Sequence, residues 1–310
     1  CPAVTMHLHK EGVLASRMHR HCRAFCGKQQ AHAQPRLIRC AATTTPIHQP
    51  KAYQREAAKF FVDSFIRDNQ TVGLGTGELS SLVIEEIGTR LATGVLKGVK
   101  GVSTGDVSAS EAAFHGVPLH PSSDDIDLQV DIAFDQVNQL DVAQSACILG
   151  VGSEPRQPQL LQQLLMAQKQ ARQWIALVEK ADVVQRLRGN LPVVIDHETW
   201  EETAEEVDDL VVGDAEVWRR SEPGTLQPDA SASENPYVSE EGHNIIDIQY
   251  GSDGVMLFGE PVEYESVDSE LMEIVGVIAT GWLIGVAHAA VVAAPAGPEL
   301  VPLVSQGPLV

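Results

Sequence analysis

Cysteine, aromatic side chains and positive charge are scarce over most of this 310-residue chain. Four of the five cysteines lie within the first 40 residues, so residues 51–310 keep only Cys147 and cannot form an internal disulfide. A body without disulfides fits a reducing compartment. It must be stabilised by its own hydrophobic core, which this length allows in one or two domains.

Basic residues are unevenly distributed. The first 50 residues hold seven of the 22 Lys and Arg and one of the 42 Asp and Glu, so residues 51–310 keep 15 basic and 41 acidic side chains. Such a negative surface repels phosphate backbones and anionic lipid headgroups. The composition therefore argues against nucleic acid and membrane as partners.

The leader, residues 1–42, is basic, almost free of acids and rich in Ala, His and Gln. This composition is typical of organelle transit peptides. Arg39-Cys40-Ala41-Ala42 resembles a chloroplast processing site, so we expect the leader to be removed and the protein to reside in the plastid stroma. A disordered basic arm that binds an acidic partner is the alternative.

Strand and helix patterns alternate from residue 51 to residue 178. Apolar spacing predicts helices over residues 51–70, 78–91 and 160–173 and one beginning near Ser108, with strands at 71–72, 99–102, 126–130 and 174–178. This alternation predicts a parallel, doubly wound sheet. Ligands of such sheets bind beyond the carboxyl ends of the strands, where residues 73–81, 103–106 and 131–135 would gather.

The pattern changes after residue 187. Strands at 191–195 and 244–250, an acidic helix at 200–210, a helix near 267–273 and the polar loop 221–236 indicate a smaller α+β unit. The uncharged run 274–294 is long enough to be considered as a membrane span. Glycines divide it into short β-branched pieces, so two buried strands fit better.

The run Gly73-Leu74-Gly75-Thr76-Gly77 reads as a phosphate loop. Glycines let the backbone approach a ligand, and the helix that follows directs free N–H groups at an anion. Glu78 occupies the place of a small hydroxyl residue, and a carboxylate about 4 Å from phosphate costs on the order of 4 kcal/mol per charge pair at an effective dielectric of about 20. Alternatively, Glu78 faces water and stabilises the helix start.

Three motifs in order resemble type A ribose-5-phosphate isomerase: the glycine loop, Ser103-Thr104-Gly105-Asp106, and residues 127–135 with the sequence DLQVDIAFD. The resemblance covers roughly residues 51–294. It implies a Rossmann-like α/β domain at 43–187 and a smaller α+β domain at 188–284 that contains the inserted loop. It also implies a C-terminal segment, 285–310, whose strand near 287–293 returns to the first domain.

The resemblance implies interconversion of ribose 5-phosphate and ribulose 5-phosphate through an enediolate, without metal or cofactor. In the family a glutamate is the base, a lysine opens a glycine-rich loop, and two aspartates belong to an Asp-Gly-Ala-Asp-Glu motif. Thr-Gly-Ser-Thr and a lysine of the first helix hold the phosphate. The implied partner is a small sugar phosphate, and the chain is expected to form a homo- or hetero-dimer if it assembles.

The catalytic positions match this pattern unevenly. Asp131 and Asp135 match the two aspartates only if Phe134 is an inserted residue, and Leu149 falls on the lysine position. The base position falls on residue 158 when counted forward and on residue 164 when counted back from the following helix, and neither is acidic. Glu154 is the nearest carboxylate. The candidate catalytic residues are therefore Asp131, Asp135 and Glu154.

The binding positions match better. Thr76 matches the first phosphate threonine, and Arg55 falls near the first-helix lysine. The candidate substrate-binding residues are Arg55, Gly75, Thr76, Gly77, Ser103, Thr104, Gly150 and Gly152. Two hypotheses follow. The chain is either an isomerase-family enzyme whose activity is weak or lost, or a non-catalytic sugar-phosphate binder or partner subunit of the same fold.

Overall fold

The computed structural model of the chain describes residues 50–121, 128–151, 159–221, 236–239, 241–251 and 253–304. They belong to one compact unit, His48–Val310. The leader and most of the inserted loop lie outside the described residues, so the expectations for both stay predictions.

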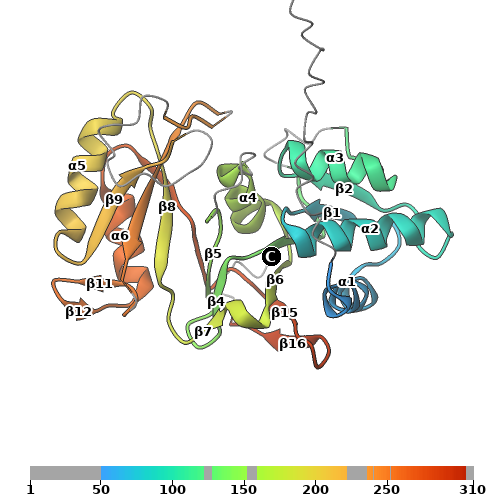
Figure 1. Ribbon diagram of the computed structural model, residues 1–310. Coiled ribbons are helices and arrows are strands. Elements are labelled where there is room, and N and C mark those ends of the chain that lie inside the picture. Colours follow the sequence, from blue (N-terminus) through green and yellow to red (C-terminus); the bar gives the residue numbers. More distant parts are fainter. Residues whose placement is uncertain are drawn as a thin grey trace, which may run out of the picture. The chain divides into compact units, whose positions relative to one another are not determined.

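A six-stranded sheet has the strand order β16-β15-β6-β3-β1-β2; β1, β2, β6, β15 and β16 are labelled in Figure 1. Its strands are β1 (Thr71–Leu74), β2 (Lys100–Ser103), β3 (Ile132–Gln136), β6 (Trp174–Glu179), β15 (Ala289–Ala293) and β16 (Glu299–Pro302). All neighbours pair in parallel except the edge strand β16. The predicted parallel α/β sheet is confirmed, and the strand expected near residues 287–293 lies beside β6.

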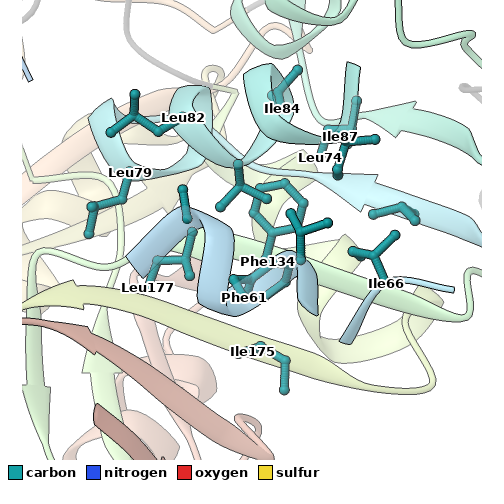
Figure 2. Close-up of a cluster of buried hydrophobic side chains, with 14 of the residues drawn as sticks. Phe61, Ile66, Leu74, Leu79, Leu82, Ile84, Ile87, Phe134, Ile175 and Leu177 are labelled. Carbon is teal, nitrogen blue, oxygen red and sulfur yellow. The ribbon is translucent and has the colours of Figure 1, made fainter. Parts of the chain in front are cut away.

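Helices α1 (Ala52–Phe65), α2 (Glu78–Ala92) and α3 (Asp106–His115) alternate with the first strands. Figure 2 shows the core that α1 and α2 form with this sheet, in which Phe61 and Phe134 meet edge to face with ring centroids 5.0 Å apart. Fully burying one such side chain is worth about 1.5–3 kcal/mol. This packing fixes the start of α2 relative to the end of β3.

The smaller α+β part contains an antiparallel sheet of order β13-β8-β10-β9. Its elements are β8 (Gly189–Ile195), α5 (Trp200–Val211), β9 (Ala215–Arg219), β10 (Asn244–Tyr250), the hairpin strands β11 (Met256–Leu257) and β12 (Glu260–Pro261), α6 (Tyr264–Glu273) and β13 (Val277–Thr280). A third sheet joins β4 (Gln139–Asp141), β5 (Ala146–Ile148), β7 (Val183–Val184) and β14 (Trp282–Ile284).

The uncharged run 274–294 forms strands, as predicted, but it supplies three, β13, β14 and β15, where two were expected. Within the described residues, no helix has both the length and the apolar character needed to cross a membrane.

Two elements differ from the sequence-based expectation. The prediction of a strand at 126–130 was wrong, because the central strand β3 begins only at Ile132. Four of its five residues are buried, so it shows an apolar run instead of the alternation that marks a half-exposed strand. The helix expected at 160–173 is α4 (Leu160–Leu165), which continues as a π-helical turn, Met166–Gln170.

Candidate active site

The carboxyl ends of three neighbouring strands bring the glycine loop and the end of β3 together. Leu74, the last residue of β1, pairs with Ser103 of β2 on one side and with Phe134 of β3 on the other. The residues that follow each strand therefore meet at one edge of the sheet. Ligands of open parallel sheets bind at this edge.

Glycine is required in the loop because β3 lies so close. A Cβ atom on Gly75 would lie 2.3 Å from the Phe134 carbonyl oxygen and 2.5 Å from Asp135 Cα. Gly77 has a φ of +98°, and a Cβ there would lie 2.7 Å from Gln136 Oε1. These contacts leave no room for another residue at either position, so the loop has one fixed path over the end of β3.

Asp135 lies at the centre of this edge and is only 2% exposed. Its Oδ1 accepts hydrogen bonds from the backbone N–H groups of Thr76 (2.9 Å) and Gln136 (2.8 Å), and its Oδ2 accepts one from Gln163 Nε2 (2.6 Å). Burial raises the pKa of this carboxyl to about 7, although the three hydrogen bonds lower it. A carboxyl with a pKa near neutrality is suited to proton transfer.

Gln163 of α4 completes the cluster and was missed by the sequence analysis. Its Nε2 also donates to Thr76 Oγ1 (2.8 Å), while its Oε1 has no hydrogen-bond partner within the described part of the chain. Counting back from the following helix gave Leu164, whose side chain is instead buried in the core. The π-helical turn accounts for the difference of one residue, because a π-bulge places one extra residue between α4 and β6. The residue that faces the site is therefore Gln163.

The end of β3 also corrects the alignment of the aspartate motif. With β3 running to Gln136, the segment Asp135-Gln136-Val137-Asn138 follows the Asp-Gly-Ala-Asp order without an inserted residue. Asn138 then stands at the second aspartate. Its Nδ2 donates to the Val151 carbonyl oxygen (2.7 Å) and its Oδ1 accepts the Val151 N–H (3.1 Å). The side chain thus holds the loop after Gly150 in place.

Asp131 was predicted to join Asp135, and this prediction was wrong. It precedes β3, and its Oδ2 accepts the N–H of Thr71, the first residue of β1 (2.8 Å). Asp131 therefore lies at the amino edge of the sheet, opposite the glycine loop. Arg172 Nη1 lies 3.9 Å from its other carboxylate oxygen.

Other expected residues have structural roles or lie elsewhere. Arg55 is half-exposed and pairs with Glu85 of α2 at 3.0 Å, away from the loop. Thr104 Oγ1 donates to the Leu74 carbonyl oxygen (2.9 Å), which ties the end of β2 to β1. Ser103 is the last residue of β2. Glu154 and Gly152 lie outside the described residues.

Leu149 and Gly150 open the second glycine segment. Leu149 is buried in the core at 1% exposure, so the position matched to the family's lysine carries no charge. Gly150 has a φ of +79°, and a Cβ there would lie 2.8 Å from the side chain of Leu160. The backbone at this position therefore needs glycine, as the family's glycine-rich loop would require.

Glu78 does not simply face water. Gln54 of α1 donates from its Nε2 to Glu78 Oε2 (2.9 Å) and to Glu179 Oε1 (2.6 Å), so one buried amide bridges two carboxylates. Lys51 Nζ lies 3.4 Å from Glu179 Oε2, which also accepts a hydrogen bond from Tyr53 (2.9 Å). Burial raises the pKa of Glu179, but the hydrogen bonds from Tyr53 and Gln54 and the charge of Lys51 outweigh it and leave the pKa below its usual value.

We expect replacement of Asp135 by Asn to stabilise the protein at pH 8 but not at pH 4. The unfolded chain ionises this carboxyl near pH 3.8, whereas the folded protein keeps the proton until about pH 7. The folded state binds more protons in that window, so the contribution of the group to stability is lost as the pH rises through it. At about 1.4 kcal/mol per pKa unit, the loss has an upper limit of roughly 4 kcal/mol.

Urea unfolding of Asp135→Asn and of the unmodified protein at pH 4, 6 and 8 measures this effect. The difference in free energy of unfolding should rise with pH. Asp131→Asn, which removes a partly exposed carboxylate at the opposite edge of the sheet, is the control for loss of an aspartate that is not buried. An Asp135→Asn difference that stays flat from pH 4 to pH 8 would contradict the expectation.

Comparison with known proteins places this geometry in context. The family model described as ribose 5-phosphate isomerase A (phosphoriboisomerase A) matches residues 100–297. Ribose-5-phosphate isomerase A of Deinococcus radiodurans is 30% identical over 252 residues, which cover 80% of this chain and 96% of that protein. The protein of the same name from Roseiflexus sp. is 29% identical over 247 residues, covering 79% and 93%.

Solved structures give the same comparison for the fold. A D-ribose-5-phosphate isomerase in complex with phospho-erythronic acid has a TM-score of 0.65 at 23% identity, over 81% of this chain and 97% of that one. Ribose 5-phosphate isomerase A from Methanocaldococcus jannaschii has a TM-score of 0.64 at 21% identity, over 81% and 98%. At these identities the likeness shows the fold: a parallel sheet with a smaller α+β part.

Proposed function

Because this chain belongs to the ribose 5-phosphate isomerase A family, we propose that it is a member whose interconversion of ribose 5-phosphate and ribulose 5-phosphate is strongly reduced. The observation that carries the proposal is Gln163. Its side chain lies within hydrogen-bond distance of Asp135 and Thr76, where the family pattern calls for a glutamate base. A neutral amide cannot take a proton from a sugar carbon, so the position is unable to act as the base.

The electrophilic half of the site supports the same proposal. Leu149 stands at the lysine position and is buried in the core, and Asn138 stands at the second aspartate with its amide engaged by Val151. An enediolate formed beside Asp135 would be repelled by that carboxylate. Leu149 carries no positive charge that could offset this repulsion. Loss of a base removes a factor of about 10² to 10⁴ in rate. Loss of a charged partner removes roughly another 10² to 10³.

Asp135 is the acidic group that remains at the centre of the site. Its pKa of about 7 would allow it to exchange a proton with a bound sugar hydroxyl near neutral pH. Both of its oxygens are already hydrogen-bonded, to Thr76, Gln136 and Gln163. A role in orienting a sugar through Thr76 and Gln163 therefore fits the geometry better than a role as the base.

Steady-state kinetics with ribose 5-phosphate test the proposal. We expect turnover at least about 10³-fold below the common enzymatic range of about 1 to 10³ per second. Turnover within that range would contradict the proposal. In that case Glu154→Gln should abolish the activity, because Glu154 is the carboxylate nearest to the base position in the sequence.

The second candidate function is a non-catalytic protein of the same fold that binds a sugar phosphate or pairs with an active relative as a homo- or hetero-dimer. The glycine loop supports this second candidate, because its backbone still passes closely over Asp135 although the glutamate base is absent. The basic composition of the leader further supports import into a plastid. Sequencing the amino terminus of the protein isolated from cells tests this location, since a mature chain that keeps Cys22 and Cys26 would argue against it.

A further inference from the structure

We propose that this site takes an unphosphorylated, polyhydroxyl sugar in place of a sugar phosphate, because side chains of the protein itself fill the anion position at the start of α2. The inference rests on the proposed function, since it concerns the ligand of the same edge of the sheet. It is carried by three observations: the capping of α2 by Gln136, the engagement of Glu78, and an unsatisfied buried acceptor on Gln163.

Gln136 occupies the place where the loop would close around an anion. Its Oε1 accepts the N–H of Leu79 in the first turn of α2 (2.7 Å). A Cβ atom on Gly77 would lie 2.7–3.1 Å from three atoms of the same side chain, so Gln136 lies directly against the loop. Free N–H groups at a helix start are what attract phosphate. Here a neutral amide oxygen already satisfies one of them.

Glu78 gives the same position a negative charge. Its carboxylate lies in the first turn of α2 and is held by Gln54, which also binds Glu179. Lys51 pairs with Glu179 at 3.4 Å. The carboxylate in the first turn of α2 disfavours a phosphate dianion at that helix start, whereas an uncharged ligand would not be repelled.

The uncharged polar side chains around the loop are suited to binding hydroxyl groups. The side chains that contact the loop through hydrogen bonds include the amides of Gln54, Gln136 and Gln163. Gln163 is 2% exposed, and its Oε1 has no hydrogen-bond partner within the described residues. Buried acceptors are normally satisfied, and a sugar O–H is a suitable donor. Thr76, which is bound to the other end of the same amide, adds a hydroxyl that can accept a second bond.

Calorimetric titration of the full chain with D-ribose, ribose 5-phosphate and inorganic phosphate tests this assignment. We expect ribose to bind at least as tightly as ribose 5-phosphate, and inorganic phosphate not to bind. Glu78→Gln should strengthen ribose 5-phosphate binding at least tenfold and leave ribose binding within twofold. Glu85→Gln, on the same helix but paired with the exposed Arg55, is the matched control and should change neither.

Two further variants keep the test decisive if Glu78→Gln alone perturbs folding. Gln136→Gly frees the Leu79 N–H and should also favour the phosphorylated sugar, whereas Gln163→Leu should weaken ribose binding at least tenfold. Ribose 5-phosphate binding that is tenfold tighter than ribose binding in the unmodified protein would overturn the inference. So would failure to bind ribose, or tighter binding of glucosamine, which would indicate a cationic ligand.

Turnover of ribose 5-phosphate measured on the same samples separates this inference from the proposed function. Ordinary turnover overturns the proposed function. Reduced turnover together with a clear preference for the phosphorylated sugar overturns only the inference about the ligand.

Discussion

Gln163→Glu should raise the turnover of ribose 5-phosphate by about 10²-fold or more. The new carboxylate would lie where the Gln163 amide now contacts Asp135 and Thr76, 2.6 Å from Asp135 Oδ2. Two carboxylates at this distance cannot both ionise, so they share a proton and the pKa of one rises toward neutrality. A general base with such a pKa contributes a factor of about 10² to 10⁴.

The control for this variant is the same substitution one residue earlier. Gln162 is on the same helix but only partly buried, and no hydrogen bond joins it to Asp135 among the described contacts of that carboxylate. Gln162→Glu should therefore leave turnover unchanged. Adding Leu149→Lys to Gln163→Glu should give a further gain through charge stabilisation of the enediolate. Equal rates for Gln162→Glu and Gln163→Glu would contradict the assignment of the base position.

The sequence was a good guide wherever local pattern and topology agree. Helix α1, strand β1, the glycine loop and α2 follow from one continuous pattern of apolar spacing and glycines, and the structure has them at residues 52–92. Short β-branched pieces separated by glycines predicted strands within residues 274–294, and the family resemblance predicted that the one near residues 287–293, now β15, returns to the first domain. These elements fix where the site must lie, at the carboxyl edge of the parallel sheet.

The sequence was a poor guide to which edge of the sheet, or which face of a helix, an individual site residue lies on. A central strand buried on both faces has no alternation, so the start of β3 was placed too early and Asp131 was assigned to the wrong edge. A π-helical turn leaves no clear mark in the composition, yet it moves every residue before it by one position relative to the following strand. Gln163 and Asn138 could be identified only after these registers were known.

The buried ion pair of the antiparallel sheet should show the largest effect on stability. Arg220, at 1% exposure, donates from Nε to Asp247 Oδ2 (2.8 Å) and from Nη2 to Asp247 Oδ1, and Asp247 is 0% exposed. Asn190 Nδ2 also donates to Asp247 Oδ1 (2.9 Å). Asp247 is on β10, Asn190 is on β8, and Arg220 follows β9 directly, so the cluster ties three neighbouring strands together.

Asp247→Ala should lower the free energy of unfolding by about 3–5 kcal/mol, because it removes the carboxylate that pairs with the buried Arg220 guanidinium. Replacing both partners, with Arg220→Met and Asp247→Leu, should recover most of this loss, since the buried cation is removed together with its carboxylate. The exposed pair supplies the control: Arg55→Ala should cost no more than about 1 kcal/mol. Urea unfolding of the unmodified protein, Arg220→Met, Asp247→Leu and the double variant gives the coupling energy of the pair as the departure from additivity. If the double variant is as unstable as Asp247→Ala, the loss comes from packing at β10 and the charge argument is wrong.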